Sequence, residues 1–299
     1  MIGLDGKLGE RHCSSFGSKI DCFPMRNFWT QLPKPFFAMA PMADVTDAAF
    51  RRLFARYGKP DVTWTEFVSA DGLCHPVGRQ VLMTDLLYTG AERPIVAQVF
   101  TAHPERMREA AALIAELGFD GLDINMGCPD KSIMKQGAGA KLMQDPVLAQ
   151  ALIVAAKEGA ADQIPVSVKT RIGFNTNELE TWLPALLDAQ PAAITVHART
   201  KKEMSLVPAQ WEHVTRAVEL ARGSGVFILG NGDVKSMAEA RARVEETGCD
   251  GVMIGRGLFG NPWFFADLFP ISVAERLRVM CEHTEIYEEL FFRKKSFAL

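Results

Sequence analysis

The stretch Gly121-Leu-Asp-Ile-Asn-Met-Gly-Cys-Pro129 joins a short apolar run to a sharp turn. The run from Gly121 to Ile124 predicts a buried strand, and the Asn, Gly, Cys and Pro that follow are residues that end a strand. Cys128 is therefore expected at a strand end. Next come the glycines of Gly137-Ala-Gly-Ala140, which let the backbone approach a ligand or a neighbouring segment closely. Alone, the stretch is equally consistent with a tight turn and an incidental thiol, because free cysteine is mostly a small buried hydrophobe.

Similar apolar runs recur along the chain and alternate with longer amphipathic segments. Strands are expected at residues 36–40, 62–67, 95–100, 121–125, 166–170, 193–197, 226–230 and 251–254. Helices are expected at residues 104–117, 146–158, 178–188, 209–222 and 236–247, where apolar residues recur at three- and four-residue spacing.

This alternation predicts right-handed βαβ units and a parallel sheet. Eight such units match a closed (β/α)₈ TIM barrel, whose usual size is about 250 residues. A doubly wound open sheet is the alternative. It is disfavoured because Ala40-Pro-Met-Ala43 follows the first strand, where that fold carries a glycine-rich phosphate loop.

Composition limits the class of protein. The 299 residues are 48% hydrophobic, which is ample for a large core, and the formal net charge of −3 argues weakly against nucleic-acid binding driven by bulk charge. The six cysteines include no C-x-x-C pair, so neither a zinc site nor a disulfide framework is suggested. No apolar run approaches the roughly 18 residues that span a bilayer. We expect a cytoplasmic protein without a metal site or a membrane segment.

Three regions are expected along the chain. Residues 1–30 lack apolar periodicity and predict a poorly ordered extension, with translation starting at Met25. Residues 31–269 form the barrel. Residues 270–299 begin a separate helical segment with a helix at 273–290, and the absence of helix-stop residues before Leu299 suggests a longer domain cut short.

Barrel enzymes place their chemistry at the C-terminal ends of the strands, and the polar residues of this chain follow that rule. They are Glu66, Gln98, Asn125, Cys128, Lys169, Arg171, His197 and Arg199. After the last two expected strands come Asn231-Gly-Asp233 and Gly255-Arg-Gly257, which combine small residues, free backbone N–H groups and a cation. These turns predict a phosphate site.

Seven short motifs at these strand ends carry a resemblance to a known family. They are Ala40-Pro-Met-Ala-Asp-Val-Thr-Asp47, Asn125-Met-Gly-Cys-Pro129, Gly137-Ala-Gly-Ala140, Val168-Lys-Thr-Arg171, Val196-His-Ala-Arg-Thr200, Asn231-Gly-Asp233 and Gly255-Arg-Gly257. In this order they resemble the tRNA-dihydrouridine synthase family, from about Phe36 to Phe269. The resemblance implies an FMN-dependent barrel with a C-terminal helical domain that helps to grip tRNA. The chain departs from the family in having few residues after Pro262, which puts tRNA affinity in doubt, and Ala198 after the sixth-strand histidine.

The resemblance implies that Cys128 is the general acid. Reduction of the uracil 5,6 double bond needs a hydride at C6 and a proton at C5, and a thiol with a pKa near 8.5 is mostly protonated at neutral pH. A nucleophilic role is the alternative. It would need a lowered pKa and a neighbouring base, and no histidine is adjacent in the sequence.

Cofactor and substrate contacts are implied in the same way. Lys169 is assigned to the electron-rich pyrimidine end of the flavin, Gln98 to the same ring edge and His197 to a further flavin contact. The alternatives are an ion pair inside the barrel, a satisfied core amide and a core histidine, respectively. The phosphate and ribityl chain are assigned to Asn231, Gly232, Asp233, Gly255 and Arg256, the underside of the ring to Pro41, Met42 and Ala43, and substrate contact to Asn125 and Arg171.

The implied function is FMN-dependent reduction of a tRNA uridine to 5,6-dihydrouridine by a monomeric enzyme, with NADPH or NADH reducing the flavin. Two alternatives stay open. One is an FMN-dependent oxidoreductase for a free pyrimidine or enone, and the other is a non-catalytic barrel that binds RNA or a protein partner.

Overall fold

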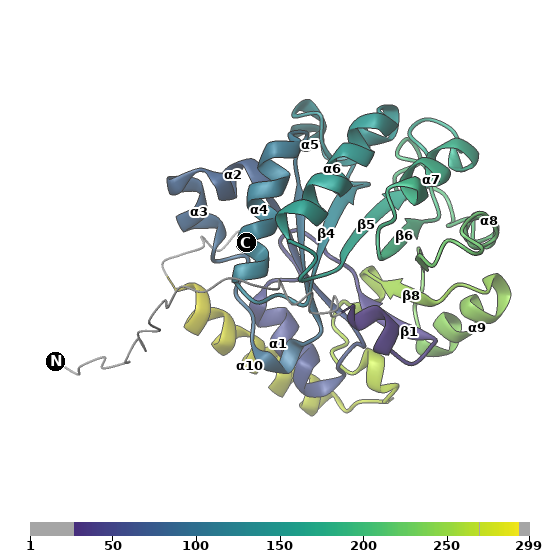
Figure 1. The fold of residues 1–299 in the computed structure, drawn as a ribbon. Helices are drawn as coiled ribbons and strands as arrows, with labels where there is room; N and C mark the ends of the chain where they lie inside the picture. Colours follow the sequence, from purple (N-terminus) through teal and green to yellow (C-terminus); the bar gives the residue numbers. More distant parts are fainter. Residues whose placement is uncertain (1–26, 269, 293–299) are drawn as a thin grey trace, which may run out of the picture.

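The computed structural model describes residues 27–268 and 270–292. The expected extension before residue 27, the start at Met25 and residues 293–299 lie outside this part. At its centre is a ring of strands surrounded by helices (Figure 1). The strands are β1 Phe36–Met39, β2 Thr63–Ser69, β3 Ile95–Phe100, β4 Gly121–Met126, β5 Val166–Arg171, β6 Ala193–His197, β7 Phe227–Asn231 and β8 Gly251–Ile254.

The strands are parallel and lie in the order β1-β8-β7-β6-β5-β4-β3-β2. The ring closes between its first and last members, because Ala38 of β1 bridges Val62 in parallel and the Met39 N–H donates to the Val62 carbonyl over 3.0 Å. The predicted (β/α)₈ barrel is therefore confirmed, and all eight expected strands are present with ends shifted by at most two residues.

Helices connect the strands on the outside of the barrel. They are α1 Ala48–Tyr57, α2 Ala70–Cys74, α3 Pro76–Leu82, α4 Pro104–Glu116, α5 Lys131–Lys135, α6 Pro146–Gly159, α7 Leu179–Asp188, α8 Glu212–Leu220, α9 Met237–Thr247 and α10 Val273–Phe291. Two expected starts are capped as the sequence indicates: Asp145 accepts from the Leu148 N–H at 3.0 Å, and Ser236 accepts from the Glu239 N–H at 3.1 Å. The expected helix at 209–222 is shortened to α8, because residues before 212 line a cavity instead.

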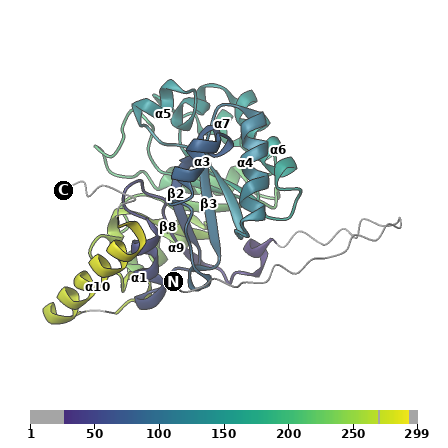
Figure 2. The same ribbon diagram turned by 90° about the vertical axis from the view of Figure 1, so that its left-hand side faces the viewer.

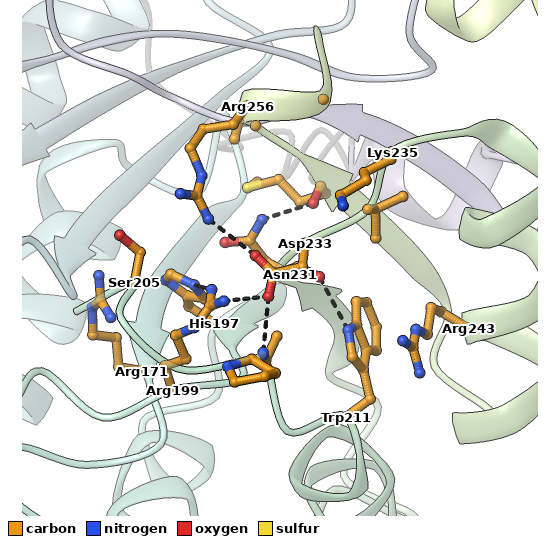
Figure 3. Close-up of a pocket in the computed structure, with 18 of the residues that line it drawn as sticks. Arg171, His197, Arg199, Ser205, Trp211, Asn231, Asp233, Lys235, Arg243 and Arg256 are labelled. Carbon is orange, nitrogen blue, oxygen red and sulfur yellow. Dashed lines mark hydrogen bonds and ion pairs between the residues drawn. The ribbon is translucent and has the colours of Figure 1, made fainter. Parts of the chain in front are cut away.

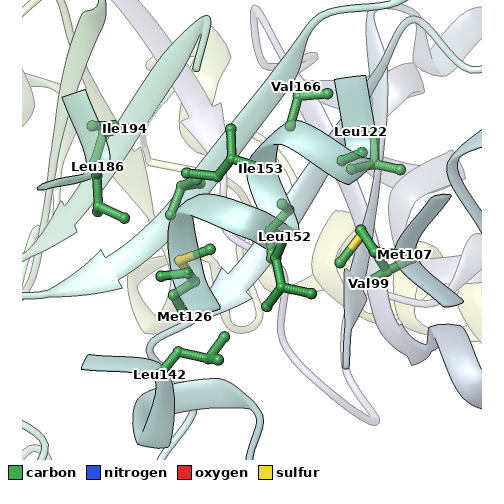
Figure 4. Packing of buried hydrophobic residues seen from close by; sticks show 14 of the residues in the cluster. Val99, Met107, Leu122, Met126, Leu142, Leu152, Ile153, Val166, Leu186 and Ile194 are labelled. Carbon is green, nitrogen blue, oxygen red and sulfur yellow. The ribbon is translucent and has the colours of Figure 1, made fainter. Parts of the chain in front are cut away.

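The main apolar core lies between the strands and the outer helices. Figure 4 shows Met107 of α4 and Leu152 and Ile153 of α6 packed over Leu122 of β4 and Val166 of β5. These side chains are almost completely buried. Their packing holds the strands from the outside of the barrel. The barrel interior can therefore contain polar groups toward the C-terminal ends of the strands.

The interior changes character along the barrel axis. At the N-terminal ends of the strands, Trp29 of the short helix η1 (Phe28–Gln31) closes the barrel and is only 1% exposed. Its ring centroid lies 5.4 Å from that of Phe36, 5.9 Å from Trp64 and 6.3 Å from Phe227. Further up, Gln98, Asp123 and other polar side chains replace the aromatic ones.

The expected C-terminal helix is present as α10, which packs along α1 in both views (Figures 1 and 2). Phe291 of α10 is buried with Ala48 and Ala49 of α1, and the Tyr57 hydroxyl donates to Glu282 over 2.5 Å. The described part of α10 therefore rests on the barrel wall. Among the described residues, no helix is both long and apolar enough to cross a membrane.

Candidate active site

A cavity of about 1050 Å³ opens at the C-terminal ends of β1 and β5 to β8. Its volume is at the upper end of the range for small-molecule and cofactor sites. The predicted residues that line it are Pro41, Met42, Lys169, Arg171, His197, Asn231, Gly232, Asp233, Gly255 and Arg256. The predicted residues outside its lining are Ala43, Gln98, Asn125 and Cys128.

One end of the cavity is a cradle of main-chain donors. Within the described residues, none of the N–H groups of 232–234 and 255–257 donates a hydrogen bond to the protein. Gly232 and Asp233 both have positive φ, at 139° and 54°, which turns the chain after β7. Free N–H groups at the ends of two adjacent strands favour an anion, in line with the phosphate site predicted for these two turns.

Asp233 is the centre of the charge network beside this cradle. Its carboxylate accepts from Arg256 Nη2 at 3.0 Å, from the Ala209 N–H at 2.9 Å, and from Arg199, so that two guanidinium groups converge on it (Figure 3). Burial opposes ionisation, but the hydrogen bond from Ala209 and the charges of Arg199 and Arg256 outweigh it and lower the pKa of the Asp233 carboxyl. Arg256 remains largely exposed, with its side chain free to bind a second anion.

Lys169 stands on β5 at the inner wall of the cavity. Burial, together with the nearby charge of Arg171, lowers the pKa of its ammonium to about 8, against the opposing charge of Asp123. Its Nζ donates to Asn231 Oδ1 over 3.2 Å, and Asn231 in turn donates to the Met253 carbonyl over 2.7 Å. The ammonium is thus held in place and would gain stabilisation from an anionic ligand.

His197 at the end of β6 is neutral at physiological pH. Burial and the surrounding cations, Lys169 first among them, lower the pKa of its imidazole well below the ordinary value. Nε2 lies 3.1 Å from Arg199 Nη1, and since a guanidinium only donates, Nε2 must accept and the ring proton must lie on Nδ1. His197 can therefore donate one hydrogen bond from Nδ1 to a bound molecule.

Cys128 lies in the loop after β4, outside the cavity lining but near the lining residues Lys169 and Arg171. Its side chain packs with Phe100, Ile133 and Ala138, and this burial raises the pKa of the thiol. The Cys128 N–H donates to Asn125 Oδ1 at 2.9 Å, and its carbonyl accepts from the Ala140 N–H at 2.9 Å. The thiol is therefore protonated at neutral pH and sits on a main chain that is held from both sides.

Arg171, at the end of β5, links this loop to the loop that follows β6. Its Nε donates to the Gly127 carbonyl over 2.8 Å, and its Nη1 donates to the carbonyls of Thr200 and Met204 over 3.1 and 3.0 Å. Among hydrogen bonds within the described residues, its Nη2 makes none. Arg171, predicted to contact the substrate, thus keeps one nitrogen available for that contact. Its other nitrogens hold the loops after β4 and β6.

Gln98 and Asn125 lie inside the barrel wall. Gln98 Nε2 donates to Asp123 Oδ2 at 2.6 Å, and Gln98 Oε1 accepts from Asn125 Nδ2 at 3.1 Å. Asn125 Oδ1 accepts from the N–H groups of Gly127 and Cys128. For Gln98 this geometry favours the alternative of a satisfied core amide, and for Asn125 it favours support of the Cys128 loop over direct substrate contact.

Several residues of the site have no role in the sequence analysis. Arg199 bonds to both His197 and Asp233, and Trp211 Nε1 donates to the Gly232 carbonyl over 3.0 Å (Figure 3). Asp123 is fully buried beneath Gln98. The sequence analysis placed Arg199 at a strand end but gave it no role, whereas Trp211 and residues 205–209 reach the cavity only through the path of a loop.

Comparison with known proteins agrees with this geometry. Residues 38–295 match the family model described as dihydrouridine synthase (Dus). The chain is 40% identical to the probable tRNA-dihydrouridine synthase 2 of Bacillus subtilis (strain 168), covering 88% of this chain and 81% of the relative. It is also 40% identical to a probable tRNA-dihydrouridine synthase of Staphylococcus aureus (strain COL), covering 80% of this chain and 73% of the relative. The chain belongs to the dihydrouridine synthase family.

A solved structure shares the fold of this dihydrouridine synthase family member. It is the 6-hydroxypseudooxynicotine amine oxidase HisD of Pseudomonas geniculata N1, with a TM-score of 0.57 over 83% of this chain and 47% of that chain. At 12% identity the likeness concerns the barrel alone.

The dihydrouridine synthase family is flavin-dependent, and the donor set of this cavity fits such a group. The free N–H groups of 232–234 and 255–257 and the exposed Arg256 suit a phosphate. Lys169 and the neutral His197 offer hydrogen-bond donors further along the same cavity, where the polar edge of a ring would lie. The residues present therefore fit a flavin nucleotide.

Proposed function

We propose that this protein reduces a uridine of tRNA to 5,6-dihydrouridine with FMN as its cofactor and NADPH or NADH as the reductant. The observation that carries the proposal is a protonated, immobilised thiol beside a cavity that has an anion cradle at one end and a lysine in its wall. Both relatives named above are described as probable tRNA-dihydrouridine synthases, which supports the choice of substrate.

FMN, when bound, supplies the hydride that uracil C6 receives. The cradle of 232–234 and 255–257 would bind the phosphate together with Arg256. Pro41 and Met42 would contact the apolar face of the ring, and Ala43, which is exposed and lies outside the cavity lining, would contact it only if this loop moved. The Lys169 ammonium would stabilise negative charge at the pyrimidine end, and His197 Nδ1 would donate a hydrogen bond to the same molecule.

Cys128 would then protonate C5 of the uracil as a general acid. Burial against Phe100, Ile133 and Ala138 keeps the proton on sulfur until the substrate carbanion develops, because it disfavours the free thiolate. The same burial argues against a nucleophilic role, which requires a lowered thiol pKa. In the enzyme–substrate complex, the charges of Lys169 and Arg171 would stabilise the thiolate that remains.

The substrate must leave the tRNA stack to reach this cavity. Arg171 lines the cavity and would contact the extruded nucleotide through Nη2. Lys131 and Lys135 of α5 and Lys201 and Lys202 after β6 are candidates for phosphate contacts around the mouth. We propose a monomer as the active form.

The proposal is tested by mapping dihydrouridine in host tRNA. Deletion of the gene should remove the modification from at least one tRNA position, and the wild-type chain should restore it. Cys128→Ala should not restore it, whereas Cys281→Ala, which removes an exposed thiol of α10, should. Restoration by Cys128→Ala would refute the acid role.

Two other results would favour the alternative functions. Turnover of free uracil or an enone, with none on tRNA, would favour the alternative oxidoreductase. A purified protein without bound flavin or reductase activity would favour the RNA-binding barrel.

A further inference from the structure

Asp123 is a fully buried carboxylate that the chemistry above leaves unused. It lies in the middle of β4 with 0% exposure, and its two oxygens accept from Gln98 Nε2 and Ser167 Oγ, each at 2.6 Å. Burial raises the pKa of this carboxyl to about 6. It is therefore still ionised at neutral pH, and burying the charge lowers the stability of the fold. Because a buried carboxylate is destabilising, its presence here indicates a role that an apolar side chain could not perform.

The hydrogen bonds above Asp123 all run in one direction. The Cys128 N–H donates to Asn125 Oδ1 at 2.9 Å, Asn125 Nδ2 donates to Gln98 Oε1 at 3.1 Å, and Gln98 Nε2 donates to Asp123 Oδ2 at 2.6 Å. The first group in this chain can only donate, and the last, as a carboxylate, can only accept. Each of the two amides between them therefore has one permitted orientation.

The orientation matters most at the upper end of the chain. An Asn125 amide turned by half a rotation would present its NH₂ group to the N–H groups of Gly127 and Cys128, and both hydrogen bonds would be lost. Gln98 prevents this rotation as long as its own oxygen faces Asn125. Asp123 in turn prevents the rotation of Gln98, because a carboxylate repels an amide oxygen.

We propose that Asp123 is a positioning residue that fixes the main chain of Cys128 through the oriented amides of Gln98 and Asn125. This inference rests on the proposed function for its effect on catalysis, but its structural part can be measured without turnover. Asn at this position would still offer an oxygen to Gln98 Nε2, but its NH₂ group could also turn toward Gln98, so we expect a small loss with Asn and a larger one with a residue that has no acceptor.

The test compares Asp123→Leu with Asp123→Asn in the full chain carrying its flavin. Alkylation of Cys128 by iodoacetamide, followed by peptide mass spectrometry, reports how firmly its loop is held. We expect Asp123→Leu to speed alkylation about tenfold and to lower kcat by a similar factor, which corresponds to the loss of about one hydrogen bond. Asp123→Asn should stay within about threefold of wild type in both measurements. KM for tRNA should not change in either variant.

A control and a second variant keep the test decisive. Asp120→Asn, at the opposite end of β4 where the carboxylate binds Arg93 and the Ile95 N–H, should leave alkylation and kcat at wild-type values. If Asp123→Leu does not fold, Gln98→Met cuts the same chain of hydrogen bonds one link higher and should give the same faster alkylation.

Three results would overturn the inference. They are wild-type alkylation in a folded Asp123→Leu or Gln98→Met variant, equal defects in Asp123→Leu and Asp123→Asn, and a kcat that does not follow the alkylation rate. A wild-type protein that makes no dihydrouridine would refute the proposed function instead, and the alkylation rates would still decide whether Asp123 positions Cys128.

Discussion

Replacement of Gly139 by alanine should disturb the loop that carries Cys128. Gly139 has a φ of +62°, and a Cβ placed there would lie 2.8 Å from the Cys128 carbonyl oxygen and 2.9 Å from Ile133 Cγ2. The next residue, Ala140, donates its N–H to that same carbonyl at 2.9 Å. The glycine thus lets two segments meet at the point where the thiol is held.

The expected cost has two parts. An L-residue at this φ costs about 1 kcal/mol in backbone strain, partly offset by a stiffer unfolded chain. The two contacts below 3 Å require the neighbours to move, and overpacking of this kind costs about 1–3 kcal/mol. Gly139→Ala should therefore lower the free energy of unfolding by about 2–4 kcal/mol, with a fall in melting temperature of roughly 2–4 °C per kcal/mol.

Gly223→Ala is the matched control. Gly223 has a φ of +81° and no atom within 4 Å of the added Cβ, so it reports the backbone cost alone. Urea unfolding of both variants, together with dihydrouridine formation on tRNA, would separate the two parts. If Gly139→Ala loses no more stability than Gly223→Ala and keeps full activity, the close approach of Gly139 to Cys128 plays no part in holding the loop.

Two further predictions concern the cofactor end of the site. Lys169 has a folded pKa of about 8 against an ordinary 10.5, so between these values the unfolded chain binds a proton that the folded one does not, and stability should rise with pH in that window. Lys169→Met should flatten this rise, as measured by urea unfolding of flavin-free protein from about pH 7 to 10, and an unchanged slope would contradict the assignment. Arg256→Gln should weaken FMN binding about 10- to 100-fold in fluorescence titrations, because one charge-assisted hydrogen bond is lost. An unchanged affinity would place the phosphate elsewhere.

The barrel could be predicted from sequence because its signals are local. Apolar runs such as 121–125 and the capping residues Asp145 and Ser236 act within a few neighbouring positions, and each gave an element that the structure contains. Helices α1, α2, α3 and α5 were not among the expected ones. For α3 the reason is that Val77 and Val81 are exposed and give it no buried apolar face.

The candidate site was predictable only to the level of strand ends. The rule that polar residues follow barrel strands brought Lys169, His197 and Asp233 together correctly, because it depends on topology alone. The same rule could not predict which of these polar side chains form hydrogen bonds with one another. Gln98 and Asn125 bond inside the wall, a fact that depends on the register of β3 against β4.

The aromatic closure at the base of the barrel bears on how the chain folds as it is made. Trp29 precedes the first strand, yet one of its ring partners is Phe227 at the start of β7. Until about two hundred further residues have left the ribosome, Trp29 has no complete site, and contacts of such high sequence separation slow folding. The apolar ends of the early strands therefore stay exposed until β7 has been made, and this is the stage at which the chain is most prone to aggregate.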